Sequence, residues 1–262
     1  MKKIITLSTL LGFILAFAQT NLKVAYQFKY LTDSTNKYSE KEDLMVLHHL
    51  GETSYYYSEL KRKGDSTRQA DINKGMDMAT MMANRDKYGR GKVALSVVKD
   101  FSKKQLSFVE PILEKTYEYT EAIPSIDWKT TNEKQQILNY EVVKAVGSFG
   151  GRVWEAWFAP AIPVADGPYK FQGLPGLILK VQDTKQNFVM TAVAIEQNRP
   201  QNFTPTKENL IRTNKKKYQE LKALSVRDFM KFVNVNSEVS ISPKNPQTSQ
   251  PKERPYNPIE LN

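Results

Sequence analysis

The stretch Gly150–Asp183, GGRVWEAWFAPAIPVADGPYKFQGLPGLILKVQD, decides how this chain folds. It sets Trp154 and Trp157 among closely spaced glycines and prolines. Glycine reaches positive φ without steric cost and proline fixes φ at about −65°, so this composition predicts a specific, irregular backbone. The two tryptophans are three residues apart and point to opposite faces of a strand, so only one of them is expected to face the interior with certainty.

The second half of this stretch predicts two corners. In Leu174–Leu177, proline and glycine occupy the positions that a type II turn requires. Gly167–Pro168 predicts another corner. Between them, Tyr169–Phe171 is expected to form a short, stiff extended piece.

Working outward, alternating apolar residues predict strands on both sides. In Leu22–Tyr30 the apolar side chains recur at every second position, which is typical of a half-buried strand. Tyr140–Val146 and Val153–Phe158 predict a hairpin around the glycine-rich turn Gly147–Arg152. Further strands are predicted at Asp43–Leu50, Glu52–Ser58, Val93–Lys99, Gln105–Val109, Thr116–Thr120, Leu177–Gln182 and Phe188–Glu196.

Helical patterns are fewer. Asn73–Arg85 predicts a short helix, and Pro205–Leu224 predicts another because its apolar residues fall on one stripe. Ser225 with Asp228 resembles a capping box for a helix that runs through Val233. The polar segment Glu59–Asn73 is expected to be a loop. Together these patterns predict a mainly-β or α+β fold: a curved, mostly antiparallel, half-barrel-like sheet with two or three helices against it.

The ends of the chain differ from its middle. Residues 1–18 have two lysines, an apolar run and an Ala-x-Ala site, which predicts a cleaved signal peptide and export to the periplasm or beyond. No later segment is long and apolar enough to span a membrane. Residues 19–241 are expected to form a single β-rich domain, and residues 242–262 a proline-rich extended or disordered tail.

Composition narrows the function classes. The absence of cysteine excludes disulfides, thiol catalysis and thiolate metal sites. The net charge of +10 is spread along the sequence and is not accompanied by a nucleic-acid motif, so we expect no nucleic-acid partner.

Catalytic patterns are also missing. His48 and His49 are adjacent, so in a strand they face opposite sides and cannot easily share a metal ion. The sequence holds no G-x-S-x-G, G-x-G-x-x-G or P-loop motif. Glu155, Asp166 and Asp183 are the carboxylates from which an acid/base group could be built, although such residues more often cap turns or form ion pairs. We therefore predict no catalytic residue, metal or cofactor.

The core motifs resemble those of the GLPGLI family, bacterial envelope proteins without an established activity. The resemblance covers most of the chain after the signal peptide, and many members carry a Cys where this chain has Val143. It rests on Tyr140, Lys144–Ala145, Gly150–Arg152, Trp154, Trp157–Phe158, Ile162–Pro163, Gly167–Phe171, Gly173–Ile178 and the closing Asn257–Leu261.

These observations lead to three alternative functions. The first is a non-enzymatic envelope protein that binds an apolar ligand, such as a lipid, or an exposed apolar peptide segment in the concavity of the sheet. The second is an interaction module of an outer-membrane assembly that uses the C-terminal tail, and the third is a hydrolase built on the carboxylates above. If the first function is right, the aromatic residues of the core stretch line the mouth of a pocket. If their role is purely structural, they only attach an irregular crossover to the sheet. The predicted ligand-binding residues are Trp157, Phe158, Tyr169, Phe171, Leu174, Met81 and Met82.

Overall fold

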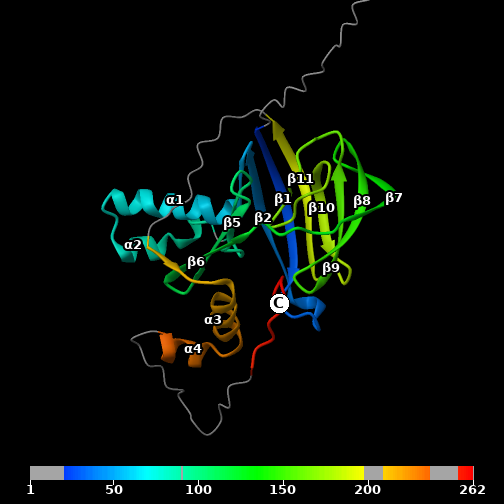
Figure 1. Cartoon of the computed structure of the whole chain (residues 1–262). Coiled ribbons are helices and arrows are strands. Elements are labelled where there is room, and N and C mark those ends of the chain that lie inside the picture. The colour runs from blue at the N-terminus through cyan, green and yellow to red at the C-terminus, as the bar shows by residue number, and fades with distance from the viewer. Residues whose placement is uncertain (1–20, 90, 198–208, 237–252, 262) are drawn as a thin grey trace, which may run out of the picture.

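A computed structural model describes residues 21–89, 91–197, 209–236 and 253–261, which form one broad, curved sheet with four α-helices (Figure 1). The helices are α1 (Glu59–Asn73), α2 (Met78–Ala83), α3 (Lys215–Arg227) and α4 (Phe229–Asn236). The strands are β1 (Asn21–Leu31), β2 (Glu40–Leu50), β3 (Thr53–Ser58), β4 (Ser96–Asp100), β5 (Gln105–Ile112), β6 (Lys115–Ala122), β7 (Lys129–Ile137), β8 (Tyr140–Phe149), β9 (Arg152–Ala159), β10 (Leu177–Asp183), β11 (Phe188–Gln197) and β12 (Leu210–Arg212).

The twelve strands follow the order β12-β6-β5-β4-β3-β2-β1-β11-β10-β9-β8-β7. All neighbours are antiparallel except β12 and β6, which pair in parallel. The sheet is therefore mixed and open, with β12 and β7 at its edges. The predicted class, a curved and mostly antiparallel sheet with helices against it, is confirmed, but the described residues form four helices where two or three were expected.

Burial explains why the alternating segments form strands. In β1, Leu22, Val24, Tyr26 and Phe28 are buried, while Lys23 and Gln27 between them are not. The same period extends across the neighbouring strands, so one side of the sheet becomes a continuous apolar face. The predicted signal peptide, together with residues 242–252 and 262 of the predicted tail, lies outside the described residues. In the described part of the chain, no helix is long and apolar enough to cross a membrane.

Leu210–Arg212, inside the predicted helix Pro205–Leu224, is strand β12, because the helix α3 begins only at Lys215. Two further segments form elements that the sequence did not predict. Glu59–Asn73, expected to be a loop, is helix α1. The side chain of Ser58 accepts a hydrogen bond from the Lys61 backbone at its first turn, and Arg62 pairs with Glu59 along its surface. The second segment is β7, which the sequence did not indicate because it is polar on both faces.

The helix after α3 also begins differently. Ser225 lies inside α3, and the side chain of Asp228 accepts from the backbone of Lys231. Asp228 is therefore the capping residue of α4, and the predicted capping box is wrong. A capping side chain bonds the free N–H groups of the first turn, which Ser225 cannot reach from within the preceding helix.

The connection between β9 and β10, residues 160–176, lies on the apolar side of the sheet. Tyr169 has φ 54° in a turn closed by a hydrogen bond from the Phe171 backbone to the Pro168 carbonyl, so the expected extended piece is wrong. The expected type II turn is also absent at Leu174–Leu177, where the Gly176 N–H bonds the Leu174 carbonyl directly. Gly176 is required because a Cβ there would lie 2.3 Å from the Ala159 carbonyl oxygen.

Candidate binding site

A cavity of about 290 Å³ lies between the apolar face of the sheet, helix α3 and the C-terminal segment, which we define as residues 253–261. Its wall contains residues of β1, β5, β6 and β11, together with Tyr169 from the crossover. Aromatic side chains are the largest group in the lining of the cavity. Its aromatic lining residues are Phe28, Tyr30, Phe108, Tyr119, Tyr169, Phe188, Tyr218 and Tyr256.

The C-terminal segment covers this cavity. Figure 1 shows it running upward from the level of α3 to the lower end of the sheet. Arg152 donates to the side-chain oxygen of Asn257 at 2.6 Å and to the carbonyls of Pro258 and Ile259 at 2.7 and 3.1 Å. The Leu261 backbone donates to the Gly150 carbonyl at 2.7 Å. Gly150, with φ 57°, is needed at this turn because an added Cβ would lie 2.8 Å from Glu260.

Glu260 carries the segment's one buried carboxylate into a cluster of charges beside the cavity. Its oxygens lie 2.6 Å from Lys170 Nζ and 2.5 Å from Lys215 Nζ, and the Tyr169 hydroxyl donates to it at 2.5 Å. Glu121 completes the cluster, 2.5 Å from Lys170. Burial raises the pKa of Glu260, but the charge of Lys170 and the hydrogen bonds together hold that pKa below its usual value.

A second buried carboxylate, Asp166, lies in the crossover. Lys99 of β4 approaches it to 2.5 Å and also donates to the carbonyls of Gly167 and Phe171. His49 of β2 contacts the other carboxylate oxygen at 3.0 Å. Burial raises the pKa of Asp166, but Lys99 and His49 outweigh it and lower the pKa to about 2. Burial also lowers the pKa of Lys99, against the raising effect of Asp166.

The remaining candidate catalytic groups form separate pairs. Arg152 contacts Asp183 at 3.4 Å, and Lys144 contacts Glu155 at 3.0 Å. His48 faces away from His49 and lies 2.9 Å from the Tyr57 hydroxyl, and its pKa is lowered to about 4 mainly by burial. Among the described residues, no group of three or more acidic, histidine or cysteine side chains could hold a metal ion.

The structure brings only one of the seven predicted ligand-binding residues, Tyr169, into the cavity wall. Phe171 and Leu174 are fully buried in the crossover, and Phe171 packs on Trp154 at 4.6 Å between ring centroids. Met81 is buried in α2, whereas Met82 is 68% exposed. Whether these residues contact a ligand stays a prediction.

The two tryptophans of the core stretch are both buried. Trp154 lies inside against Phe171, whereas Trp157 and Phe158 are covered within the β8–β10 part of the sheet. The ring of Trp157 is packed under Lys180, whose ammonium lies 4.7 Å from the ring centroid, and under Lys144. Trp157 lies on the face of the sheet opposite the crossover, where the aliphatic parts of Lys180 and Lys144 cover it.

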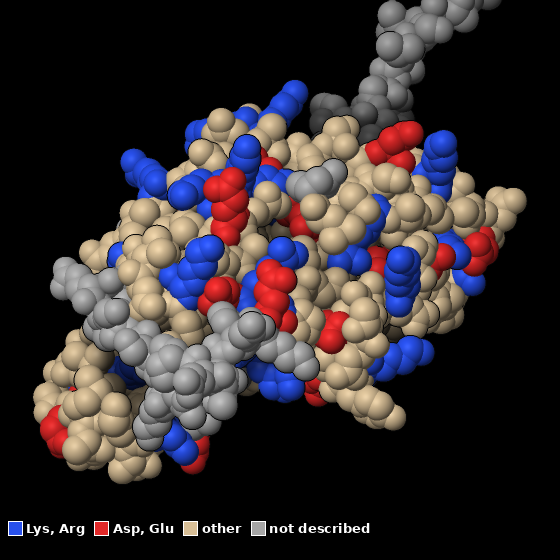
Figure 2. All heavy atoms as spheres, turned by 90° about the horizontal axis from the view of Figure 1, so that it is seen from below, with Lys and Arg blue, Asp and Glu red and all other residues tan. Residues whose placement is uncertain are grey.

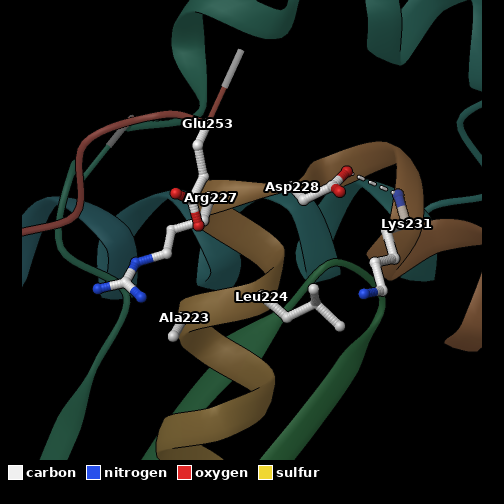
Figure 3. Close-up of a pocket in the computed structure, with 6 residues that line it drawn as sticks. All are labelled: Ala223, Leu224, Arg227, Asp228, Lys231 and Glu253. Atoms are coloured by element: carbon white, nitrogen blue, oxygen red, sulfur yellow. Dashed lines mark hydrogen bonds between the residues drawn. The ribbon is translucent and has the colours of Figure 1, made fainter. Parts of the chain in front are cut away.

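A second hollow, of about 470 Å³, lies between the end of α3, the start of α4 and Glu253 (Figure 3). Four of its six lining residues are charged, with both signs present: Arg227, Asp228, Lys231 and Glu253. Figure 3 shows the Asp228 carboxylate bonded to the Lys231 backbone, where it caps α4. The other lining residues, Ala223 and Leu224, offer little apolar surface, so this hollow is a weaker candidate than the aromatic cavity.

Basic and acidic side chains are interspersed on the face of the molecule seen in Figure 2. No extended patch of one sign stands out among the described residues of that view. This pattern agrees with the scattered charges of the sequence and offers no continuous track for a phosphate backbone on that face.

Lys170, Lys215 and Glu260 were not predicted as site residues. Lys170 lies within the Gly167–Phe171 motif and Glu260 within the closing Asn257–Leu261 motif, both of which carry the family resemblance. The sequence signal for these two residues was a charged side chain inside an otherwise apolar motif. The sequence could not show that Lys170 and Glu260, which are far apart in the chain, pair with each other.

Comparisons with known proteins agree with this picture of the fold and leave the activity open. A family model described as a protein of unknown function (Porph_ging) matches residues 151–180, within the core stretch. No curated protein matches the chain.

Two solved structures of PNGF-II have a similar fold. The one in space group P21 gives a TM-score of 0.52 at 15% identity over 78% of this chain. The one in space group C2 gives a TM-score of 0.51 at 16% identity, again over 78% of this chain. The chain spans 33% and 32% of those two chains, about a third of PNGF-II. At this identity the likeness shows a shared fold alone.

Proposed function

We propose that this protein is an exported, non-enzymatic envelope protein of the GLPGLI type that binds an apolar ligand inside its curved sheet. The observation that carries the proposal is the aromatic cavity beneath the C-terminal segment. Ligand sites are typically concave, largely apolar and equipped with a few polar groups that orient the ligand. The cavity has this composition, and its volume of about 290 Å³ suits a small or slender ligand.

The arrangement of charged groups supports binding over catalysis. Asp166, Asp183 and Glu155 belong to three different ion pairs, so they do not converge on one reacting atom. The polar groups nearest the cavity are engaged with one another: Tyr218 donates to Glu110, which also pairs with Lys222 at 2.7 Å. Such groups can orient a ligand from the wall of the aromatic cavity.

The cellular location is part of the proposal. It is supported by the signal-like residues 1–18 and by the lack of cysteine, which suits a fold that must persist in an oxidising compartment without disulfides. The match of residues 151–180 to a family of unknown function agrees with the GLPGLI resemblance, since the same glycine and proline motifs lie in that range.

The test is native mass spectrometry and organic extraction of protein purified from cell envelopes. We expect an apolar molecule to copurify, and we expect Val226→Trp, which fills the cavity from α3, to remove it. Val235→Trp is the matched control, because Val235 is 69% exposed on α4 and does not line the cavity. Equal retention by both variants, or no copurifying molecule in any of them, would contradict ligand binding in this cavity.

The alternative is an interaction module in which the C-terminal segment engages another envelope protein. The specific observation in its favour is that Leu261 is 57% exposed, although its neighbour Glu260 is buried. In-cell crosslinking separates the two functions. A single stoichiometric partner that is lost on deletion of residues 255–262, with no copurifying apolar molecule, favours the interaction module.

A further inference from the structure

The charge cluster around Glu260 is balanced only while that carboxylate is present. Lys170 and Lys215 face Glu121 and Glu260, so two positive charges meet two negative ones. Without Glu260, one positive charge is in excess. Lys170 cannot carry that excess into water, because its side chain is fully buried and its ammonium lies 5.1–5.4 Å from the ring centroids of Phe108, Tyr119 and Tyr169. Lys215 is 29% exposed and can be hydrated, but the buried Lys170 faces the place of Glu260 away from water, so this place favours one anionic group.

The same place opens onto the aromatic cavity. Tyr169, Tyr119 and Phe108 contact the lysine ammonium and also line the cavity wall, and Glu260 itself lines the cavity. A molecule with its apolar part in the cavity can thus reach Lys170 and Lys215 with a terminal group. The Tyr169 hydroxyl, held 2.5 Å from the Glu260 carboxylate, would donate a hydrogen bond to that group.

The C-terminal segment that brings Glu260 to this place is attached mainly through side chains. Within residues 253–261, the backbone N–H groups that bond other backbone groups are those of Arg254 and Leu261. Further attachment comes from Arg152, Asn257 and the Glu260 carboxylate, and from the packing of Ile259 against the core. A segment that is not a strand of the sheet can leave without breaking the sheet, so its carboxylate can be replaced by another.

We propose that the ligand is an amphiphile with a single carboxylate, and that Glu260 occupies the carboxylate position while the site is empty. This inference rests on the proposed function. The ligand's apolar chain lies in the aromatic cavity, and its carboxylate takes over the contacts with Lys170, Lys215 and the Tyr169 hydroxyl. Glu260 moves into solvent, so the cluster keeps its charge balance and the C-terminal segment competes with the ligand.

The test compares decanoate with decanol, which has a similar chain without the charge, by isothermal titration calorimetry on the full chain. Glu260→Gln removes the competing charge, and we expect it to raise the affinity for decanoate by about tenfold or more while leaving that for decanol nearly unchanged. Glu253→Gln is the matched control. It makes the same change on an exposed position of the same segment and should alter neither affinity.

A second variant tests the lysine. Lys170→Met in the Glu260→Gln background leaves Lys215 and Glu121 as a neutral pair, so the chain is expected to fold, which circular dichroism checks. We expect this double variant to bind decanoate no better than decanol. Loss of the preference for decanoate, with retained binding of decanol, is a result that a purely structural role of Lys170 would not produce.

The outcomes separate this inference from the proposed function. If decanol and decanoate bind equally and Glu260→Gln has no effect, the carboxylate site is overturned while apolar binding stands. If neither probe binds any variant, both proposals fail. If a synthetic peptide of residues 253–262 binds Glu260→Gln tightly and decanoate does not, the site recognises a peptide carboxylate, which also overturns the amphiphile.

Discussion

Asp166 and Glu260 are both buried carboxylates that meet lysine side chains on the inner side of the sheet, but the chain delivers them differently. Asp166 lies in a crossover whose two ends are strands, and its partners Lys99 and His49 are themselves on strands. Glu260 lies in the C-terminal segment, which is not a strand of the sheet, and one of its partners, Lys215, is 29% exposed on α3. The same carboxylate–lysine pair is thus held between strands in one region and by a segment outside the sheet in the other, and under our proposal only the second pair exchanges with a ligand.

The largest effect on the free energy of unfolding is expected for a substitution of Lys99. Lys99→Met leaves the Asp166 carboxylate buried without its ammonium, which should destabilise the protein by about 3–5 kcal/mol in urea unfolding. Adding Asp166→Asn removes the uncompensated charge and should recover part of this loss. A loss below about 1 kcal/mol for Lys99→Met would mean that the Asp166 cluster is not the permanent element that the comparison requires.

The second-largest expected effect is a loss of stability in acid, which follows from the lowered pKa of Asp166. Its folded-state pKa of about 2 lies below its ordinary value of 3.8, so its ion pairs stabilise the fold above about pH 4. That contribution, about 2 kcal/mol, is lost as the pH falls from about 4 to about 2. Urea unfolding at a series of pH values measures it. Asp166→Asn should have a flatter profile in this window, and an unchanged profile would refute the assignment.

Removing the Glu260 carboxylate should destabilise the protein less than Lys99→Met does. Glu260→Gln keeps an oxygen that accepts from Tyr169, while the partly exposed Lys215 can turn to water, so we expect a loss of about 1–2 kcal/mol by thermal unfolding. Glu253→Gln, on the exposed part of the same segment, should change stability by less than about 0.5 kcal/mol. If Glu260→Gln destabilises as strongly as Lys99→Met, Glu260 is as permanent as Asp166 and the contrast disappears.

The smallest effect is expected at the solvent side of the Glu260 cluster. Lys215→Gln removes a partly exposed ion pair, which is typically worth about 0.2–1 kcal/mol. The measured difference should shrink further in high salt, because exposed charges are screened. Salt-independent destabilisation would indicate that Lys215 is held as rigidly as Lys99.

Much of the sheet could be predicted from the sequence because one of its faces is buried. The alternation of apolar and polar residues in Leu22–Tyr30 predicts which side chains face the core. The glycine-rich turn at Gly147–Arg152 predicts the hairpin of β8 and β9. Lys129–Ile137 carries no such signal, since both faces are polar and its pairing partner alone makes it a strand. Helix α1 was missed for a related reason: a polar surface helix has no apolar stripe to reveal it.

The site was harder to predict because distant residues determine it. The glycines and prolines of residues 160–176 correctly indicated an unusual backbone, but the turn at Tyr169 depends on packing against other parts of the chain. Glu260 pairs with Lys170, 90 residues earlier, and Arg152 contacts Asn257, which is 105 residues away. No local pattern encodes such contacts, so the sequence indicated the motifs without showing that residues 253–261 pack against Arg152 and Lys170.

The polar strand β7 has a consequence for the behaviour of so wide a sheet in a crowded compartment. An open sheet exposes backbone N–H and C=O groups at its outer strands, and these groups can recruit further strands into aggregates. Here β7 bears Lys129, Glu133 and Lys134 and an irregularity between Thr130 and Lys134, whereas β12 at the opposite edge has only three residues. The charges and the irregular pairing of β7 make that edge a poor template for a further strand. Strand β12 is too short to serve as one, so the sheet can remain open without adding strands from other molecules.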